Sequence, residues 1–142
     1  VVERMRKEFK GQFTVRGASW PWPGTNPTTP EEEADLYRGA LVALNIDHFT
    51  RPYFASDRIL RAQACGALVY STPWEEGVQK ENPKIRLCAH KNAGIDEMVA
   101  SLRGILSPCE KYYPKYGGAA AELTRANHTW HRRIETMQTW MP

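Results

Sequence analysis

The sequence predicts a mixed α/β domain: a Rossmann-like, doubly wound parallel sheet of about four strands, followed by a helical C-terminal tail. Segments with strand character alternate with helical segments through most of the length, as they do in such sheets. Leu41 to Ile46 is a continuous apolar run, which is typical of a strand buried on both faces. Ser56 to Ser71 has the pattern of a helix that leads directly into a second buried strand.

The N-terminal region is expected to hold a helix, a strand and a loop. Apolar residues recur with helical spacing from Val1 to Lys10, and Gly11 stops that pattern. Phe13 to Arg16 is then expected to form a short strand that ends at Gly17. Residues 18–30 are dense in proline, glycine and tryptophan, so a surface loop is expected there.

Thr29 is expected to cap the next helix, with Pro30 in the first helical position. The acidic residues 31–33 favour the positive end of that helix dipole, which is a structural explanation for the run of three glutamates. Leu36 and Tyr37 are expected to face inward.

The helix that begins near Ser56 carries two arginines in its first turns. Ser56 is expected to accept a hydrogen bond from a backbone N–H, and Gly66 is expected to end the helix before a strand at Ala67 to Tyr70. Arg58 and Arg61 are three residues apart and therefore project from one side, where the helix dipole disfavours positive charge. A bound anion would resolve that conflict.

The rest of the chain is expected to contain a fourth strand and three helices. Pro108 and Pro114 are expected to interrupt the helical region. The strand is expected at Ile85 to Ala89 and the helices at Ile95 to Leu106, from Gly117 and Gly118 to Asn127, and from a Thr129 cap through Met141.

Several polar groups are expected to meet at one edge of the sheet. Ligands bind beyond the carboxyl ends of the strands in open parallel sheets. Gly17, the segment from Asn45 to His48, the segment from Ser71 to Glu76 and the start of the Ser56 helix would all lie at that edge. The sequence therefore predicts a crevice that accepts a phosphate-bearing ligand.

Composition is that of an ordinary globular domain. Of the 142 residues, 42% are hydrophobic and 25% are charged, and no apolar run approaches the roughly 20 residues of a membrane span. The net charge of +3 is scattered, so specific nucleic-acid binding is not expected. The three cysteines, Cys65, Cys88 and Cys109, lack metal-type spacing and favour reduced thiols in the cytoplasm. Because the first residue is not methionine, we expect the chain to be part of a longer protein.

Four segments together resemble a known family, over roughly Phe13 to Met137. They are VRGASWP at 15–21, DLYRGALVALNI at 35–46, SDRILRAQACGALVYS at 56–71 and NHTWHRRIETM at 127–137. Their order is similar to the C-terminal half of GT-B glycosyltransferases, closest to the CgeB-type proteins of the glycosyltransferase group 1 class. The third segment is the most specific, since the family carries a near-identical Ser-x-Arg, then Ala-Cys-Gly, then a strand.

The resemblance implies a domain that binds a nucleotide-sugar donor, with an unknown acceptor held by a preceding N-terminal domain or segment. It places Ser56 and Arg58 against the diphosphate, with Arg61 helping, Asn45 at the adjoining strand end and Gly17 nearby. No metal and no cofactor other than the donor is implied, and no catalytic base is assigned within this chain.

Two departures from the family pattern favour a competing hypothesis. Arg61 stands where the family usually has a glutamate that holds the nucleotide ribose, and arginine cannot accept those hydroxyl hydrogen bonds. The family's first central strand, with its glycine loop, is also not found in the sequence. Either the donor is held differently, or the chain is a degenerate glycosyltransferase-fold domain that serves binding or assembly without catalysis.

Other side chains have a structural interpretation beside a functional one. Trp20 and Trp22 could stack on a base or sugar ring, or fold onto the core. His48 is a candidate general base, and more simply a hydrogen-bonded loop residue. His128 and His131 could share a metal, but they lack a third ligand. Cys65 is most simply a small buried residue.

Overall fold

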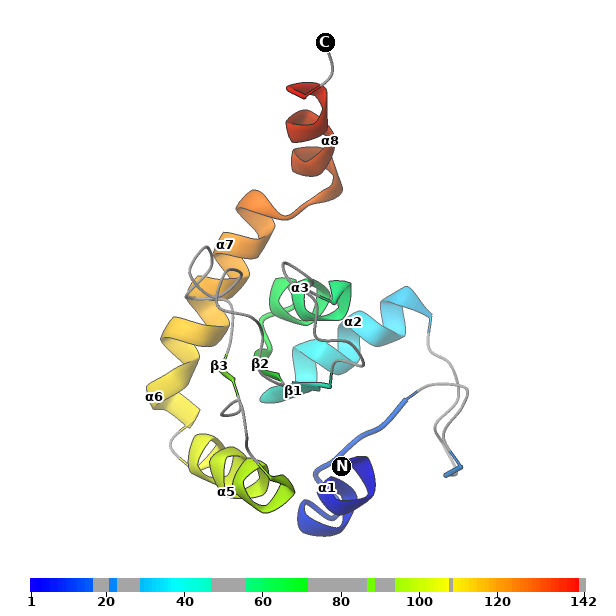
Figure 1. Ribbon diagram of the computed structural model, residues 1–142, viewed down its shortest axis with the longest axis vertical. Coiled ribbons are helices and arrows are strands. Elements are labelled where there is room, and N and C mark those ends of the chain that lie inside the picture. The colour runs from blue at the N-terminus through cyan, green and yellow to red at the C-terminus, as the bar shows by residue number, and fades with distance from the viewer. Residues whose placement is uncertain are drawn as a thin grey trace.

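The structure is a computed structural model that describes residues 1–16, 21–22, 29–46, 56–71, 87–88, 94–107 and 109–140. It is a mixed α/β fold in which helices predominate around a short parallel sheet (Figure 1). The elements in chain order are α1 (Val2–Glu8), α2 (Pro30–Gly39), β1 (Val42–Asn45), α3 (Asp57–Ala64), β2 (Leu68–Ser71), β3 (Leu87–Cys88), α5 (Ile95–Leu106), α6 (Cys109–Tyr113), the π-helix η1 (Pro114–Gly118), α7 (Ala119–Asn127) and α8 (Trp130–Gln138).

Three parallel strands form the sheet in the order β1, β2, β3. Val42 pairs with Leu68 and Asn45 with Ser71, so β1 and β2 end level with each other. The strand expected at Leu41 to Ile46 is confirmed as a shorter segment, and the one expected at Ala67 to Tyr70 is confirmed one residue later. Of the strand expected at Ile85 to Ala89, the structure describes Leu87 and Cys88, and both belong to β3. The described strands lie in sequence order, without the reversal that marks a doubly wound sheet.

The strand expected at Phe13 to Arg16 is wrong, because these residues adopt no regular structure. Phe13 is instead half-buried against the cluster that contains Met5 and Leu68. A four-residue segment with one large apolar side chain gains more from that packing than from pairing at a sheet edge.

Helices cover both faces of the sheet. Successive side chains of β2 point to opposite faces. Leu68 and Tyr70 pack with Met5 of α1 and with the apolar side of α5, whereas Val69 packs with Ile59 of α3. Both sets are almost fully buried, as expected for a central parallel strand. In contrast, β1 is only partly buried along most of its length, and Leu41 before it is exposed.

The caps and stops of the first helices largely match the sequence. Thr29 forms a capping box with Glu32: each side chain bonds the backbone N–H of the other, at 3.2 and 2.9 Å, and Pro30 opens α2. Gly66 ends the helical segment of α3 with φ of +93°, a left-handed conformation that glycine adopts without strain. Helix α5 has the expected bounds.

The C-terminal helices differ from expectation at Pro114. Instead of breaking the helix, Pro114 begins η1, a π-helical turn that joins α6 directly to α7. A Cβ at Gly117 would lie 2.7 Å from the Tyr113 ring and 3.2 Å from the carbonyl oxygen of Gly66. The wide turn therefore depends on glycine at position 117, because it lets the helix approach the end of α3 closely.

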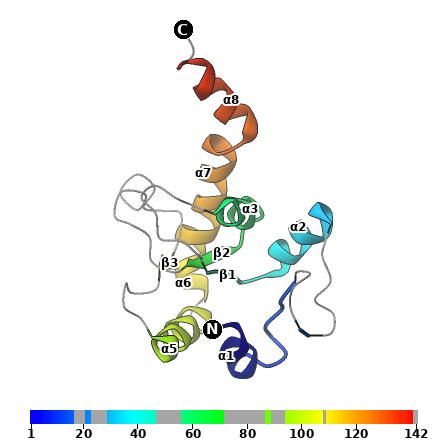
Figure 2. The same cartoon turned by 45° about the vertical axis from the view of Figure 1, so that its right-hand side comes forward.

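Helix α8 begins at the expected cap, where Thr129 accepts a hydrogen bond from the Arg132 N–H at 3.3 Å. It ends at Gln138, earlier than the expected Met141, and none of its residues is buried. Both views show it extending away from the rest of the molecule, at the end opposite α1 (Figures 1 and 2). Among the described helices, none has the length and apolar character needed to cross a membrane.

Candidate functional site

The carboxyl ends of β1 and β2 bring two buried polar side chains together. Asn45 and Ser71 pair across the parallel strands and are 5% and 0% exposed. The side-chain nitrogen Nδ2 of Asn45 donates a hydrogen bond to the Ser71 hydroxyl at 3.1 Å. The sequence predicted both Asn45 and Ser71 at this edge, and the structure adds the hydrogen bond between them.

Helix α3 begins at the same edge. It follows β1 in the chain and returns the chain to the start of β2, so its N-terminus lies toward the strands' carboxyl ends. Ser56 immediately precedes α3 and is 8% exposed. The first backbone N–H groups of α3 and its positive dipole end are therefore at the edge formed by Asn45 and Ser71.

The expected capping bond of Ser56 is wrong. Its side chain caps no backbone N–H; instead its hydroxyl accepts a hydrogen bond from Nε of Arg58 at 3.2 Å. A charged donor two residues away competes successfully with a neutral backbone donor for the same oxygen. Ser56 thus fixes the direction of the Arg58 side chain, which is otherwise exposed to solvent.

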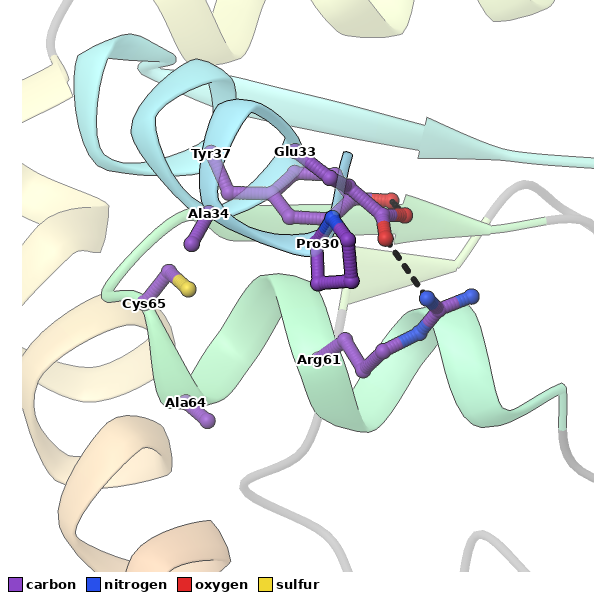
Figure 3. Close-up of a pocket in the computed structure, with 7 residues that line it drawn as sticks. All are labelled: Pro30, Glu33, Ala34, Tyr37, Arg61, Ala64 and Cys65. Carbon is purple, nitrogen blue, oxygen red and sulfur yellow. Dashed lines mark hydrogen bonds and ion pairs between the residues drawn. The ribbon is translucent and has the colours of Figure 1, made fainter. Parts of the chain in front are cut away.

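The positive charge of Arg61 is compensated by two carboxylates of the protein. Its guanidinium lies 2.6 Å from Glu33 of α2 and 3.4 Å from Asp57 of α3. Figure 3 shows Arg61 reaching across from α3 to Glu33. The expected conflict between Arg61 and the helix dipole is therefore resolved within the protein, and the anion is not required for it. Sequence reasoning assigned Glu33 only to the dipole of α2.

A small cavity of about 220 Å³ lies between α2 and α3, beside this ion pair (Figure 3). Tyr37 donates a hydrogen bond to Glu33 at 3.2 Å, and burial together with the Glu33 charge raises the pKa of Tyr37 to about 12. The charges of Arg61 and Arg58 oppose that rise. The four-residue spacing of Glu33 and Tyr37 was the signal that could have predicted their contact. The cavity is lined by Pro30, Glu33, Ala34, Tyr37, Arg61, Ala64 and Cys65.

A second cavity, of about 330 Å³, lies between α3, α7 and the start of α8 and is called the basic groove below. Arg125 donates a hydrogen bond from Nε to the Ala64 carbonyl at 2.8 Å, and the Arg133 guanidinium lies 5.2 Å from the centre of the Trp130 ring. Burial, and then the charge of Arg133, lower the pKa of His128. The groove is lined by Asp57, Leu60, Arg61, Ala64, Thr124, Arg125, His128, Thr129, Trp130 and Arg133.

Other candidates named from the sequence have structural roles or lie outside the described residues. Trp22 is covered by Arg6, whose guanidinium is 4.3 Å from the ring centre. His131 lies 3.1 Å from Glu135. Within the described ranges, no three metal-binding side chains gather. Cys65 has a free thiol and is only partly buried. Gly17, Trp20 and His48 are outside the described residues.

Comparison with known proteins gives one result. No curated protein and no solved structure matches the chain significantly. The profile of a family described as glycosyl transferase-like matches residues 1–139, which is nearly the whole chain. That match confirms the resemblance seen in the four sequence segments. The chain belongs to the glycosyl transferase-like family.

Proposed function

We propose that this chain is the nucleotide-sugar-binding half of a GT-B glycosyltransferase, with a Rossmann-like sheet whose strand ends hold the donor diphosphate. The observation that carries the proposal is the buried Asn45–Ser71 pair, which lies at the same sheet edge as the N-terminus of α3. A helix N-terminus beyond parallel strands is a favourable place for a phosphate. Family membership supports the transferase class.

Arg58 is the side chain that would neutralise the diphosphate. It is exposed at the first turn of α3, and its one described hydrogen bond goes to a neutral hydroxyl, that of Ser56. The guanidinium therefore keeps donors for an incoming phosphate. As the sugar is transferred, negative charge develops on the departing diphosphate, and Arg58 with the α3 dipole would stabilise it.

Glu33 would hold the ribose in place of the absent glutamate on α3. Arg61 occupies the glutamate position of the resembled family, yet it draws the Glu33 carboxylate to 2.6 Å from its own guanidinium. A carboxylate has about four acceptor positions. The bonds from Tyr37 and Arg61 engage one on each oxygen, and the Glu33 side chain is 24% exposed. The group that accepts the ribose hydroxyl hydrogen bonds would thus lie on α2 in this chain, at Glu33, and not on α3 as in the resembled family.

A non-catalytic role is the second candidate, and the ion pairs of Arg61 favour it. Glu33 and Asp57 compensate its charge without any ligand, which is what a domain that had lost its donor would retain. Such a domain would serve binding or assembly and would keep the fold of the family.

Calorimetric titration of the folded protein with UDP, GDP and their sugar conjugates separates the two functions. Saturable binding to one nucleotide, with the same stoichiometry for its sugar conjugate, supports donor binding. Absence of binding to every nucleotide by the protein, with a cooperative unfolding transition confirming its fold, contradicts the enzymatic function and supports the non-catalytic one. If Glu33 contacts the ribose, a Glu33→Gln variant should bind UDP more weakly and bind inorganic pyrophosphate, which has no ribose, unchanged. An equal loss of affinity for UDP and for pyrophosphate would contradict the ribose contact.

A further inference from the structure

Helix α8 exposes a row of large apolar side chains. Trp130, Ile134 and Met137 are spaced by four and three residues, so they lie on one side of the helix. They are 76%, 53% and 57% exposed, and Trp140, in the turn after the helix, is 76% exposed. We call these four residues the apolar row. Their exposed area is on the order of 500 Å², the size of the largest apolar patch on a typical monomer, and such patches often serve binding.

Positive charge surrounds the apolar row. Residues 125–140 contain three arginines and one glutamate, a formal charge of +2 out of +3 for the whole chain. Glu135 is engaged by Arg132 at 2.9 Å and by His131 at 3.1 Å, so the one acidic side chain is compensated by its own helix. In the part of the chain that the structure describes, neither Arg125 nor Arg133 forms a salt bridge.

The apolar row and the basic groove are continuous. Trp130 belongs to both, and Arg133 lies over its ring at the groove's rim. The groove also presents Arg125 and has room for a group of phosphate size at about 330 Å³. Both ribbon views show α8 leading away from this point, clear of the remaining helices (Figures 1 and 2). An occupant of this surface must therefore be apolar along α8 and anionic at its base.

A second copy of the chain does not meet that requirement. Arg133 lies on the same side of α8 as the apolar row, three residues after Trp130, so two copies packed through the row would place two guanidinium groups of like charge in one interface. The area of the row is also below the roughly 800 Å² per partner of a stable interface. An anionic phospholipid surface offers phosphate groups and an apolar layer at the depth of one helix side, and tryptophan prefers that boundary.

We propose that α8 and the basic groove form a peripheral docking site for an anionic phospholipid membrane, with the apolar row inserted at the headgroup boundary and lipid phosphates beside Arg125 and Arg133. The groove shares Arg61 with the surroundings of the proposed donor site. The membrane contacts are assigned to the apolar row, Arg125 and Arg133, none of which belongs to the donor site, so vesicle binding and nucleotide binding are tested independently. It would bring the chain to a surface from which a lipid-linked or surface-bound molecule can be reached.

Sedimentation of the full chain with phospholipid vesicles tests the proposal. We expect binding to vesicles of equal parts phosphatidylglycerol and phosphatidylcholine, weak binding to phosphatidylcholine alone, and a loss of binding as salt is raised. Trp130→Ala with Trp140→Ala should weaken binding about tenfold or more. Arg125→Gln with Arg133→Gln should weaken it roughly 25-fold, about fivefold for each charge.

Matched variants at the other end of the molecule provide controls. Lys7→Gln with Lys10→Gln removes the same number of charges from the α1 region, and Leu41→Ala removes an exposed apolar side chain from a different surface. Each control should change the affinity for vesicles less than twofold, which is smaller than the effect of losing one binding contact. Circular dichroism and urea denaturation of every variant check that the fold is retained, as expected because the substituted tryptophans are exposed and lie outside the buried core.

Three outcomes would overturn the proposal. The first is no binding to anionic vesicles at low salt. The second is a stable dimer, seen by light scattering, that Trp130→Ala dissociates, since the row would then be an interface between copies. The third is tight binding of soluble pyrophosphate that changes Trp130 fluorescence while anionic vesicles do not, because the groove would then serve a soluble anion.

Discussion

Exchanging Arg58 or Arg61 for glutamine should separate ligand binding from fold stability. Both arginines lie on α3, three residues apart, and both influence Tyr37. Arg61 is compensated by two carboxylates, whereas the described contact of Arg58 is to the neutral Ser56 hydroxyl. The two substitutions remove the same charge from the same helix, so each is the other's control.

The Arg58→Gln variant should lose nucleotide affinity and keep its stability. A charge-assisted hydrogen bond to phosphate contributes about 1.5 to 3 kcal/mol. Its loss corresponds to roughly 10- to 150-fold weaker binding of UDP or GDP. Because Arg58 is exposed, its unfolding free energy should change by less than about 0.5 kcal/mol.

The Arg61→Gln variant should show the opposite behaviour. Its side chain is 50% exposed, so the pair with Glu33 contributes a screened interaction of about 0.5 to 1 kcal/mol to stability. Nucleotide binding should weaken less than about threefold, because the charge of Arg61 is already compensated. Calorimetric titration measures the affinities, and urea denaturation measures the free energies of unfolding.

Equal losses of nucleotide affinity in the two variants would refute this reasoning, because Arg61 would then contribute to nucleotide binding in spite of its ion pairs. Unchanged affinity in Arg58→Gln would refute the assignment of Arg58 to the diphosphate. A loss of stability in Arg58→Gln larger than in Arg61→Gln would show that the Ser56 contact is structural.

Three further predictions test the fold and the site. Gly66→Ala should lower the free energy of unfolding by about 1 to 2 kcal/mol because φ is +93° there, although its Cβ would meet only an ordinary 3.5 Å contact. Gly104→Ala inside α5, where nothing lies within 4 Å of the added Cβ, should raise the free energy of unfolding by about 0.5 to 1 kcal/mol. Equal effects of the two substitutions in urea denaturation would contradict the argument from backbone conformation. The pKa of Tyr37 is raised from 10.0 to about 12, so its neutral phenol contributes stability that is fully present below pH 10 and is lost as pH rises through 12. After a discount for partial exposure, this contribution to the free energy of unfolding is about 1 kcal/mol. The free energy of unfolding of Tyr37→Phe should lack that part of the pH dependence. A double-mutant cycle of Asn45→Ala and Ser71→Ala should give a coupling free energy of about 1 kcal/mol, and a value near zero would mean that the buried bond between them does not fix the strand ends.

Local sequence signals predicted those elements whose causes are local. The capping residue Thr29, the stop at Gly66 and the full extent of α5 follow from side chains within one turn of each other. The strand β2 was predictable because its apolar run is buried on both faces. Phe13 to Arg16 had strand-like composition, but Phe13 packs against a cluster that includes Met98 and Leu102 of α5, far along the chain.

The site was predictable in location and not in pairing. The alternation of strands and helices predicted that Asn45 and Ser56 would lie at the carboxyl edge of the sheet, and both do, while their contact with a donor stays a prediction. The partner of Arg61 is Glu33, 28 positions earlier, and no spacing rule connects residues on two different helices. The π-helical turn at Pro114 likewise depends on a long-range contact, the approach of Gly117 to the carbonyl of Gly66.

Helix α3 connects the two proposed sites, because contacts on several sides fix its position. Ile59 and Ala62 bury it against the sheet, Arg61 holds it to α2, and Arg125 of α7 binds the carbonyl at its end. Its N-terminus therefore stays aligned with the strand ends whether or not an anion is present. Donors held in place before binding do not have to be ordered by the ligand, so more of the interaction energy is retained as affinity. The same helix also lines the basic groove. The sheet edge proposed to bind the donor would therefore keep a fixed orientation relative to a membrane bound at α8.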